Sequence, residues 1–217
     1  MPDFLTSGPS DAAWTLLLAH GAGAGMETPF LEQMSALLTA RGIRVVRFEF
    51  GYMAARRTGG KRRPAPKAEM LIPEYRAAVS EVRAEGVPGR LAIGGKSMGG
   101  RVASMIAGEL AEAGTVDALV CLGYPFHPPG MPEKTRTGHL ADLACPALIA
   151  QGERDPFGNR TEVESYGLGP RIEIAWIGDG DHDFGPRGAS GFTRKGNLAT
   201  AADALAGFLA GLASSGR

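Results

Sequence analysis

The chain has 217 residues, a length typical of one domain that buries roughly 70 to 75% of its unfolded surface. Lysine plus arginine and aspartate plus glutamate each number 23, so the formal net charge at pH 7 is zero. This balance excludes a general electrostatic attraction to nucleic acids or to membrane surfaces. We therefore expect a single domain over residues 1–217 that binds no nucleic acid and no membrane.

The cysteines and the N-terminal residues bear on the compartment. Cys121 and Cys145 are the two cysteines of the chain, too few for the spaced pairs of a disulfide-stabilised domain, and we expect both to be buried thiols. Asp3 stands where a signal peptide carries lysine or arginine, and no stretch approaches the roughly 18 apolar residues of a membrane span. These features predict a cytoplasmic protein.

Short apolar runs of strand length alternate with helical segments along the chain. Continuous apolar character indicates strands that are buried on both faces, as in a mostly parallel sheet. The expected strands are Thr15–Ala19, Ile43–Phe48, Leu91–Ile93, Ala118–Leu122, Ala147–Ala150 and Ile172–Ile177.

The first helix is expected to begin with Thr28 as N-cap and Pro29 as its first residue, and to stop at Gly42. Apolar residues at helical spacing predict further helices. These helices are Met70–Ala84, Gly100–Ala113 and Leu198–Leu212. Strands that alternate with helices predict an α/β fold, with a mostly parallel central sheet and helices on both faces.

Two segments, Gly51–Lys67 and Tyr124–Leu143, have no apolar period, and loops of this length are usually functional or mobile. The first holds six basic residues between Arg56 and Lys67. A solvated flap is the simple interpretation, and the alternative is a surface for an anionic substrate or a protein partner. The second segment is too short for a cap domain, so we expect an open or lightly covered pocket.

Three patterns imitate phosphate or metal sites but lack a required residue. Gly94–Ser97 would be a P-loop only with glycine at the position of Arg90. Gly21–Gly25 resembles a dinucleotide fingerprint that breaks at Met26. The acidic run 179–183 lacks the glycine and the glutamate of a calcium-binding EF-hand loop. We therefore expect no cofactor and no metal.

The motif Gly95-Lys96-Ser97-Met98-Gly99 is the one G-x-S-x-G in the chain, and it lies between a predicted strand and a predicted helix. A serine nucleophile is projected from the sheet edge by a sharp turn of this kind. Glycines at 95 and 99 relieve crowding between this turn and the neighbouring backbone. Ser97 is therefore the candidate nucleophile.

A base and an acid follow the next strands in the order that an esterase-type triad requires. Asp155 follows the strand Ala147–Ala150, and His182 follows the strand Ile172–Ile177. The order Ser97, Asp155, His182 is that of α/β-hydrolases. The backbone N–H groups of Met98 and Ala22 are expected to form the oxyanion hole.

Other residues offer plainer or competing interpretations. Asp155 could be a turn former before Pro156, and Glu153 could take the acid role instead. His20 is expected to hold the oxyanion turn rather than to transfer protons. His127 either lines the site or is an ordinary loop histidine. For His139 the sequence suggests no role, only that it is exposed. The aspartates that flank His182 could raise the pKa of His182 if their side chains face it.

Four blocks of sequence resemble known hydrolase-like proteins: His20–Gly23, Phe48–Met53, Gly95–Arg101 and Gly123–Gly130. With them the chain resembles the α/β-hydrolase superfamily, specifically its small dienelactone-hydrolase-like members and bacterial relatives of the KANSL-type hydrolase-like proteins. The resemblance implies a serine-hydrolase scaffold without a large cap domain. A typical dienelactone hydrolase uses a cysteine nucleophile, where this chain has Ser97.

The sequence thus predicts a serine hydrolase, most simply a carboxylesterase that acts on small-molecule acyl esters. Two alternatives stay open. One is a hydrolase of thioesters, lactones or peptides, since fold and triad serve all of these. The other is a binding or scaffold protein that uses the basic segment Arg56 to Lys67, because the KANSL-type group includes a subunit of a chromatin-modifying complex.

Overall fold

A seven-stranded sheet forms the centre of the protein in a computed structural model, which describes residues 3–57, 59 and 64–214. The strand order is β1-β3-β2-β4-β5-β6-β7, and all neighbours are parallel except β1 and β3. The strands are β1 (Phe4–Ser7), β2 (Trp14–Ala19), β3 (Arg44–Phe48), β4 (Arg90–Lys96), β5 (Ala118–Leu122), β6 (Ala147–Gly152) and β7 (Ile172–Ile177).

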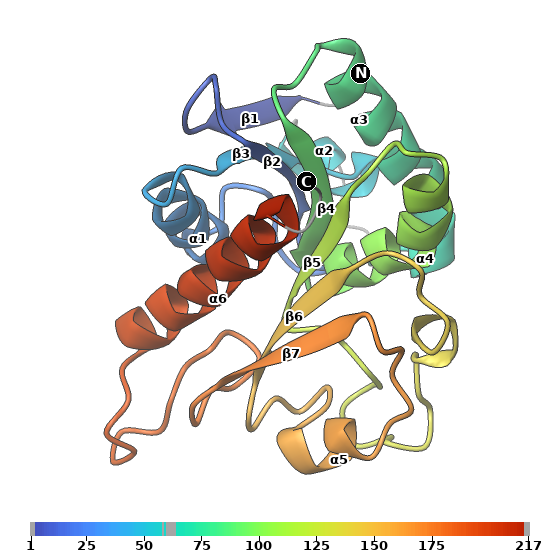
Figure 1. Ribbon diagram of the computed structural model, residues 1–217. Helices are drawn as coiled ribbons and strands as arrows, with labels where there is room; N and C mark the ends of the chain where they lie inside the picture. Colours follow the sequence, from blue (N-terminus) through green and yellow to red (C-terminus); the bar gives the residue numbers. More distant parts are fainter. Residues whose placement is uncertain (1–2, 58, 60–63, 215–217) are drawn as a thin grey trace.

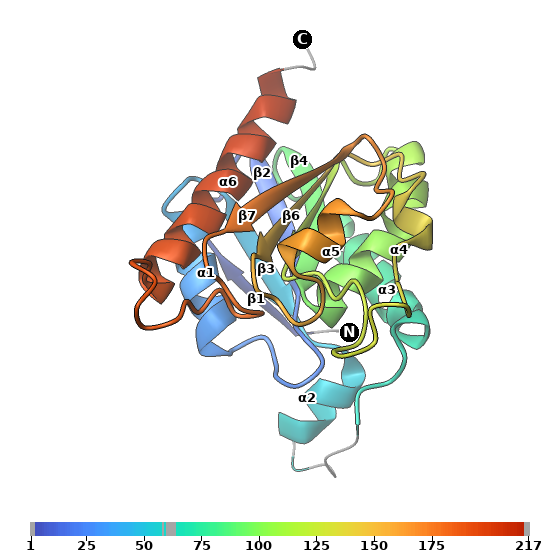
Figure 2. The same cartoon turned by 90° about the horizontal axis from the view of Figure 1, so that it is seen from below.

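Helices cover both faces of this sheet, as Figures 1 and 2 show. They are α1 (Pro29–Thr39), α2 (Gly51–Arg57), α3 (Ile72–Ala84), α4 (Met98–Glu112), α5 (Arg160–Glu164) and α6 (Arg194–Ser214), with short 3-10 turns η1 (Ala68–Leu71) and η2 (Gly138–Leu140). Helices α1 and α6 lie on one face, and α3 and α4 lie on the other. The α/β architecture with a mostly parallel sheet is therefore confirmed.

Strand β2 illustrates why these apolar runs form a central strand. Its side chains alternate, so that Leu16 and Leu18 pack with α1 and α6, while Leu17 and Ala19 pack with α3 and α4. All four are fully buried. A strand that meets a core on each face needs apolar residues at every position, which is the pattern seen in the sequence.

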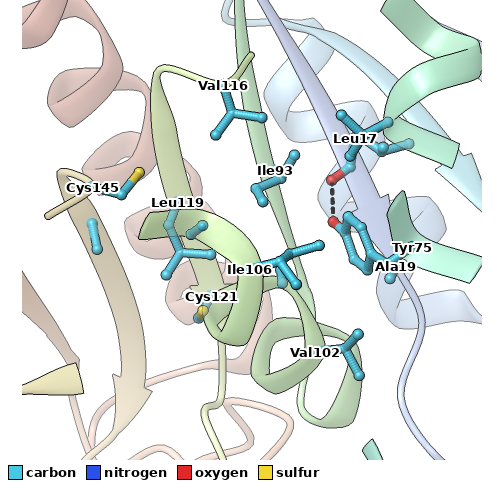
Figure 3. Packing of buried hydrophobic residues seen from close by; sticks show 14 of the residues in the cluster. Leu17, Ala19, Tyr75, Ile93, Val102, Ile106, Val116, Leu119, Cys121 and Cys145 are labelled. Atoms are coloured by element: carbon cyan, nitrogen blue, oxygen red, sulfur yellow. Dashed lines mark hydrogen bonds between the residues drawn. The ribbon is translucent and has the colours of Figure 1, made fainter. Parts of the chain in front are cut away.

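The core on the α3 and α4 side contains a buried tyrosine that links two strands (Figure 3). The Tyr75 hydroxyl accepts the N–H of Gly94 in β4 at 2.9 Å. It also lies within donating distance of the carbonyls of Leu17 in β2, at 3.0 Å, and of Gly94, at 2.7 Å. Cys121 and Cys145 are free buried thiols in the same core, as expected.

Three elements depart from the sequence predictions. β1 was not expected, because a four-residue antiparallel edge strand of partly buried residues carries little apolar pattern. α2 lies in the segment expected to be aperiodic, and three of that segment's basic residues, Lys61, Arg62 and Arg63, lie outside the described residues. α5 is a five-residue helix fixed by a capping box between Asn159 and Glu162.

Helix α6 corrects the expectation that no segment reaches the length and hydropathy of a membrane span. It has 21 residues, and an 18-residue window reaches a mean hydropathy of 1.2. Leu198, Leu205 and Leu209 on its inner side are buried against the sheet and α1. In this fold α6 is a core helix with one packed side.

The chain reverses direction across the sheet between β2 and β4. From β2 it moves outward to β3 and returns to β4 on the other side, after which the strands follow in order to β7. In open α/β sheets, sites form outside the carboxyl ends of the strands at such a switch point. The turns after β2 and β4 begin there, at His20 and Ser97.

Candidate active site

Ser97 occupies a strained turn between β4 and α4. Its φ is 51° and its ψ is −115°, a backbone conformation that costs a non-glycine residue about 1 to 3 kcal/mol. A Cβ at Gly99 would lie 2.6 Å from the carbonyl oxygen of His20, and one at Gly95 would lie 2.7 Å from that of Ala19. The two glycines are needed because backbone, which cannot rotate away, occupies the space beside the turn.

Three polar side chains from different strand ends form one hydrogen-bonded chain. His182 Nε2 lies 2.9 Å from Ser97 Oγ, and His182 Nδ1 lies 2.8 Å from Asp155 Oδ2. Asp155 is fully buried after β6, and His182 is partly exposed after β7. The structure therefore brings together the three residues that the sequence singled out as nucleophile, base and acid.

The Asp155 carboxylate is fixed by donors on both oxygens. Oδ1 accepts the backbone N–H of Phe157 at 2.8 Å, and Oδ2 accepts Gln151 Nε2 at 3.0 Å in addition to His182. Gln151 cannot reverse its amide, because its Oε1 accepts the N–H of Tyr124 at 2.7 Å. The carboxylate therefore presents one fixed acceptor to the imidazole.

The loop that carries His182 is tied to the serine turn by a buried lysine. Lys96 Nζ donates to the carbonyl oxygen of His182 at 2.8 Å and lies 3.2 Å from Asp183 Oδ1. Burial lowers the pKa of Lys96, and the nearby Asp183 opposes that change. The ring of Phe157 also lies against the imidazole, with 4.3 Å between centroids. His182 is thus held from several sides.

The competing acids are occupied elsewhere. Glu153 accepts the N–H of Asp179 at 2.9 Å and pairs with Arg160 at 3.0 Å, so the alternative acid does not contact His182. Asp181 accepts the backbone N–H groups of Asp183 and Gly185 within its own loop. The flanking acids therefore shape the loop and pair with Lys96 rather than with the imidazole.

The turn after β2 is held by His20 and Tyr52. His20 Nε2 accepts the N–H of Phe50 at 3.1 Å, so its proton sits on Nδ1, which donates to the carbonyl of Gly21 at 2.6 Å. Burial lowers the pKa of His20 to about 4, which keeps this tautomer neutral. Tyr52 donates to the carbonyl of Ala22 at 3.0 Å.

Ala22 and Met98 stand beside Ser97 as the expected oxyanion-hole residues. Both line one hollow of the surface together with Ser97. Met98 is the first residue of α4, so its N–H has no intrahelical acceptor. A helix N-terminus also favours developing negative charge. The structure thus places the N–H of Met98 at a helix N-terminus directly after Ser97, with Ala22 in the same hollow.

Two hollows meet at Ser97, where the sequence predicted an open or lightly covered pocket. The first has a volume of about 530 Å³ and is lined by Phe30, Leu31 and His182 among others. The second has a volume of about 460 Å³ and is lined by Met98, Arg101 and Arg136 among others. Ala22, Ser97 and Phe157 line both. A molecule bound at Ser97 can thus extend one group into each hollow.

The two remaining histidines lie away from this site. His127 is buried, with Nδ1 2.8 Å from the carbonyl of Pro128 and Nε2 3.2 Å from the Glu162 carboxylate, so it is a structural loop residue. His139 Nε2 lies 2.8 Å from Ser104 Oγ, a contact the sequence did not suggest. Within the described ranges no three His, Cys, Asp or Glu side chains gather as metal ligands would.

Sequence reasoning missed the residues that support the triad. Gln151 carries a signal that could have found it, because a polar residue that ends an apolar strand needs a buried partner. Lys96 also stands out as a charge at the end of a buried strand. The ring of Phe157 and the hydroxyl of Tyr52 carry no comparable signal, because their roles depend on contacts across the sheet edge.

Comparisons with known proteins agree with this architecture. Residues 12–210 match the family model described as an alpha/beta hydrolase domain. A serine hydrolase homologue from Coxiella burnetii has a TM-score of 0.70 at 18% identity, over 95% of this chain and 90% of that one. A serine hydrolase without a lid from Xanthomonas campestris has a TM-score of 0.66 at 20% identity, over 94% and 89%. A dienelactone hydrolase from Anabaena variabilis has a TM-score of 0.69 at 21% identity, over 96% and 90%.

Proposed function

The chain belongs to the alpha/beta hydrolase family, with its fold and without a large cap domain, and on that premise we propose that it is a serine carboxylesterase acting on small acyl esters. The observation that carries the proposal is the continuous hydrogen-bonded chain from Ser97 through His182 to Asp155, at 2.9 and 2.8 Å. A serine hydroxyl becomes a nucleophile at neutral pH when such a base accepts its proton.

The proposed reaction has two halves. Ser97 Oγ attacks the ester carbonyl while His182 Nε2 takes its proton, and the N–H groups of Met98 and Ala22 stabilise the oxyanion. His182 then gives the proton to the leaving alcohol, which leaves an acyl group on Ser97. Water, deprotonated by His182, releases the acid and restores Ser97. Asp155 keeps the Nδ1–H tautomer and stabilises the imidazolium in both halves.

The surroundings of Ser97 support a substrate of modest size. The two hollows that meet there are open to the surface and have volumes of about 530 and 460 Å³. Sites of this size bind small molecules, and an open site imposes little selection on overall shape. Thioesters and lactones present the same carbonyl chemistry, so they are substrates of second choice.

Covalent labelling tests the proposal directly. A fluorophosphonate probe should label the wild type and should fail to label Ser97→Ala, with hydrolysis of a short nitrophenyl ester lost in the same variant. Ser165→Ala is the matched control, because the exposed Ser165 Oγ donates to the carbonyl of Glu162 at the end of α5 and lies outside both hollows. A folded wild type that takes up no label would reject the proposal.

A binding function through the basic segment Arg56 to Lys67 is the second candidate. Part of the positive charge of this segment is neutralised by ion pairs within the protein, because Arg57 pairs with Glu49 at 3.1 Å and with Asp3 at 3.2 Å. If this candidate holds, replacing the five basic residues from Arg56 to Arg63 should abolish a protein interaction and leave ester turnover unchanged; Lys67 is kept because it lines the second hollow beside Ser97. We also propose a cytoplasmic location, since both cysteines are free thiols.

A further inference from the structure

The second hollow beside Ser97 carries an excess of positive charge. Lys67, Arg101 and Arg136 line it together with one acid, Glu69. The remaining lining residues are apolar or small, apart from Ser97. The hollow therefore has a net charge of two next to the nucleophile, although the whole chain is neutral. A local excess of this kind attracts an anionic group.

Arg136 is the arginine of this hollow that has no ion pair among the described residues. Its backbone is fixed, because its N–H donates to the carbonyl of Phe126 at 2.7 Å and its own carbonyl accepts the Tyr124 hydroxyl at 3.1 Å. Its half-buried guanidinium makes one long hydrogen bond, 3.5 Å to the carbonyl of Pro125, and no ion pair with the residues described in the structure. Most of its five N–H groups thus have no hydrogen-bond partner among the described residues.

Arg101 faces the same hollow from α4, one helical turn after Ser97. One guanidinium nitrogen pairs with Glu69 at 2.7 Å, while its buried Nε has no hydrogen-bond partner among the described residues. Burial lowers the pKa of Arg136, and the positive charge of Arg101 lowers it further. A carboxylate between the two guanidinium groups would relieve this repulsion.

The position of His182 decides which part of an ester meets these arginines. His182 lines only the first hollow, and it must deliver its proton to the leaving oxygen. The alcohol part therefore leaves through the first hollow, whose wall includes the apolar Phe30 and Leu31. The acyl part extends into the second hollow, towards Arg101 and Arg136.

We infer that the preferred substrates are esters whose acyl part ends in a carboxylate, the hemiesters of dicarboxylic acids, with Arg136 and Arg101 binding the free carboxylate. This inference rests on the proposed function and names its substrate class. Among the described residues, the charged lining of the first hollow consists of Arg194 and the Lys96–Asp183 pair, so this hollow offers no comparable pair of arginines.

Ester pairs that differ only at the acyl end test this inference. Monoethyl succinate, glutarate and adipate are compared with ethyl butyrate, valerate and hexanoate, with acid release followed by titration. We expect kcat/KM to favour at least one hemiester over its neutral partner by about tenfold or more, as a charge-assisted contact predicts. The preference should fall as salt is added, because ions screen the attraction.

Variants locate the preference. Arg136→Gln should bring the hemiester-to-neutral ratio close to one, and Arg136→Lys should keep part of it. Lys134→Gln removes a charge from the same segment at an exposed side chain whose ammonium group has Met131 Sδ as its partner among the described residues, and it should leave both rates unchanged. The ratio does not depend on how much of the variant is folded, since both esters are measured on one preparation.

The outcomes separate this inference from the proposed function. Hydrolysis of the neutral esters, with no hemiester preferred, overturns the substrate class and leaves the serine esterase intact. The substrate class is also overturned if an ester with the carboxylate on its alcohol part is preferred, or if Arg136→Gln keeps the ratio. Absence of both hydrolysis and fluorophosphonate labelling overturns the two proposals together.

Discussion

Replacing Asp155 by asparagine should disable the base rather than simply remove a charge. The asparagine must place its NH₂ group where one carboxylate oxygen stood. The backbone N–H of Phe157 is fixed and needs the acceptor at the Oδ1 position. Gln151 Nε2 can give up its contact at Oδ2, because the carbonyls of Tyr124 and Gly158 also accept from it, at 3.2 and 3.0 Å. The NH₂ group therefore faces His182.

This orientation reverses the histidine tautomer. An NH₂ donor opposite His182 Nδ1 requires Nδ1 to accept, which moves the ring proton to Nε2 and leaves Ser97 without a base. Turning the amide the other way would leave the Phe157 N–H unpaired, at a cost of about 1 to 3 kcal/mol. We expect kcat to fall by about 10⁴, the effect of a wrong tautomer in a serine triad. Steady-state hydrolysis of a short nitrophenyl ester measures this loss.

Glu153→Gln is the matched control for this experiment. It makes the same chemical change in the acid that competed with Asp155 in the sequence, and its carboxylate contacts Asp179 and Arg160 instead of His182. Its kcat should stay within about twofold of the wild type, since removing a partly exposed ion pair away from the triad has a small effect. A loss below about a hundredfold for Asp155→Asn, or ¹⁵N NMR signals of an Nδ1–H imidazole in that variant, would contradict the expected amide orientation.

Four further substitutions test the structural frame around the site. Gly99→Ala places a Cβ 2.6 Å from the carbonyl of His20 and should cost about 1 to 3 kcal/mol and displace the serine turn, lowering kcat more than tenfold. Gly108→Ala in the same helix meets only one side-chain atom at 3.8 Å, and chemical denaturation should show it unchanged or up to about 1 kcal/mol more stable. Tyr75→Phe leaves the buried N–H of Gly94 and the carbonyl of Leu17 without the hydroxyl as a hydrogen-bond partner. The free energy of unfolding, measured in urea, should therefore drop by about 2 to 4 kcal/mol, and no change would mean that the hydroxyl contributes nothing to stability. The pKa of His20 is lowered from 6.5 to about 4 in the folded protein. Between these pH values the unfolded chain protonates His20 and the folded protein does not, so the free energy of unfolding falls as the pH is lowered from 6.5 to 4, by roughly 3 kcal/mol in all. The difference in Tm between the wild type and His20→Gln should therefore shrink from pH 6.5 to pH 4, and a constant difference would refute this.

Local patterns were sufficient for the architecture. Apolar runs at strand length and the sequence signal at Thr28 and Pro29 led to β2 to β7 and α1, because burial on two faces and helix capping are encoded within a few residues. The positions of Ser97, Asp155 and His182 after three of these strands were also predicted from the order of strands and helices. Elements with little burial were missed, among them β1, which has four residues and gains its stability from pairing with a strand about forty positions later.

The sequence by itself determined the serine turn, the order of the three candidate residues and the alternation that sends them to one edge of a parallel sheet, since each of these depends on neighbours in the chain. Only the tertiary structure decided that Asp155 and not Glu153 meets His182, that Lys96 ties the histidine loop to the turn, and that Arg101 and Arg136 share a hollow at Ser97. Ser97 and His182 are 85 positions apart, and their contact depends on the register of four strands. A side chain's partner at such separations is set by packing of the whole sheet, which no short stretch of sequence records.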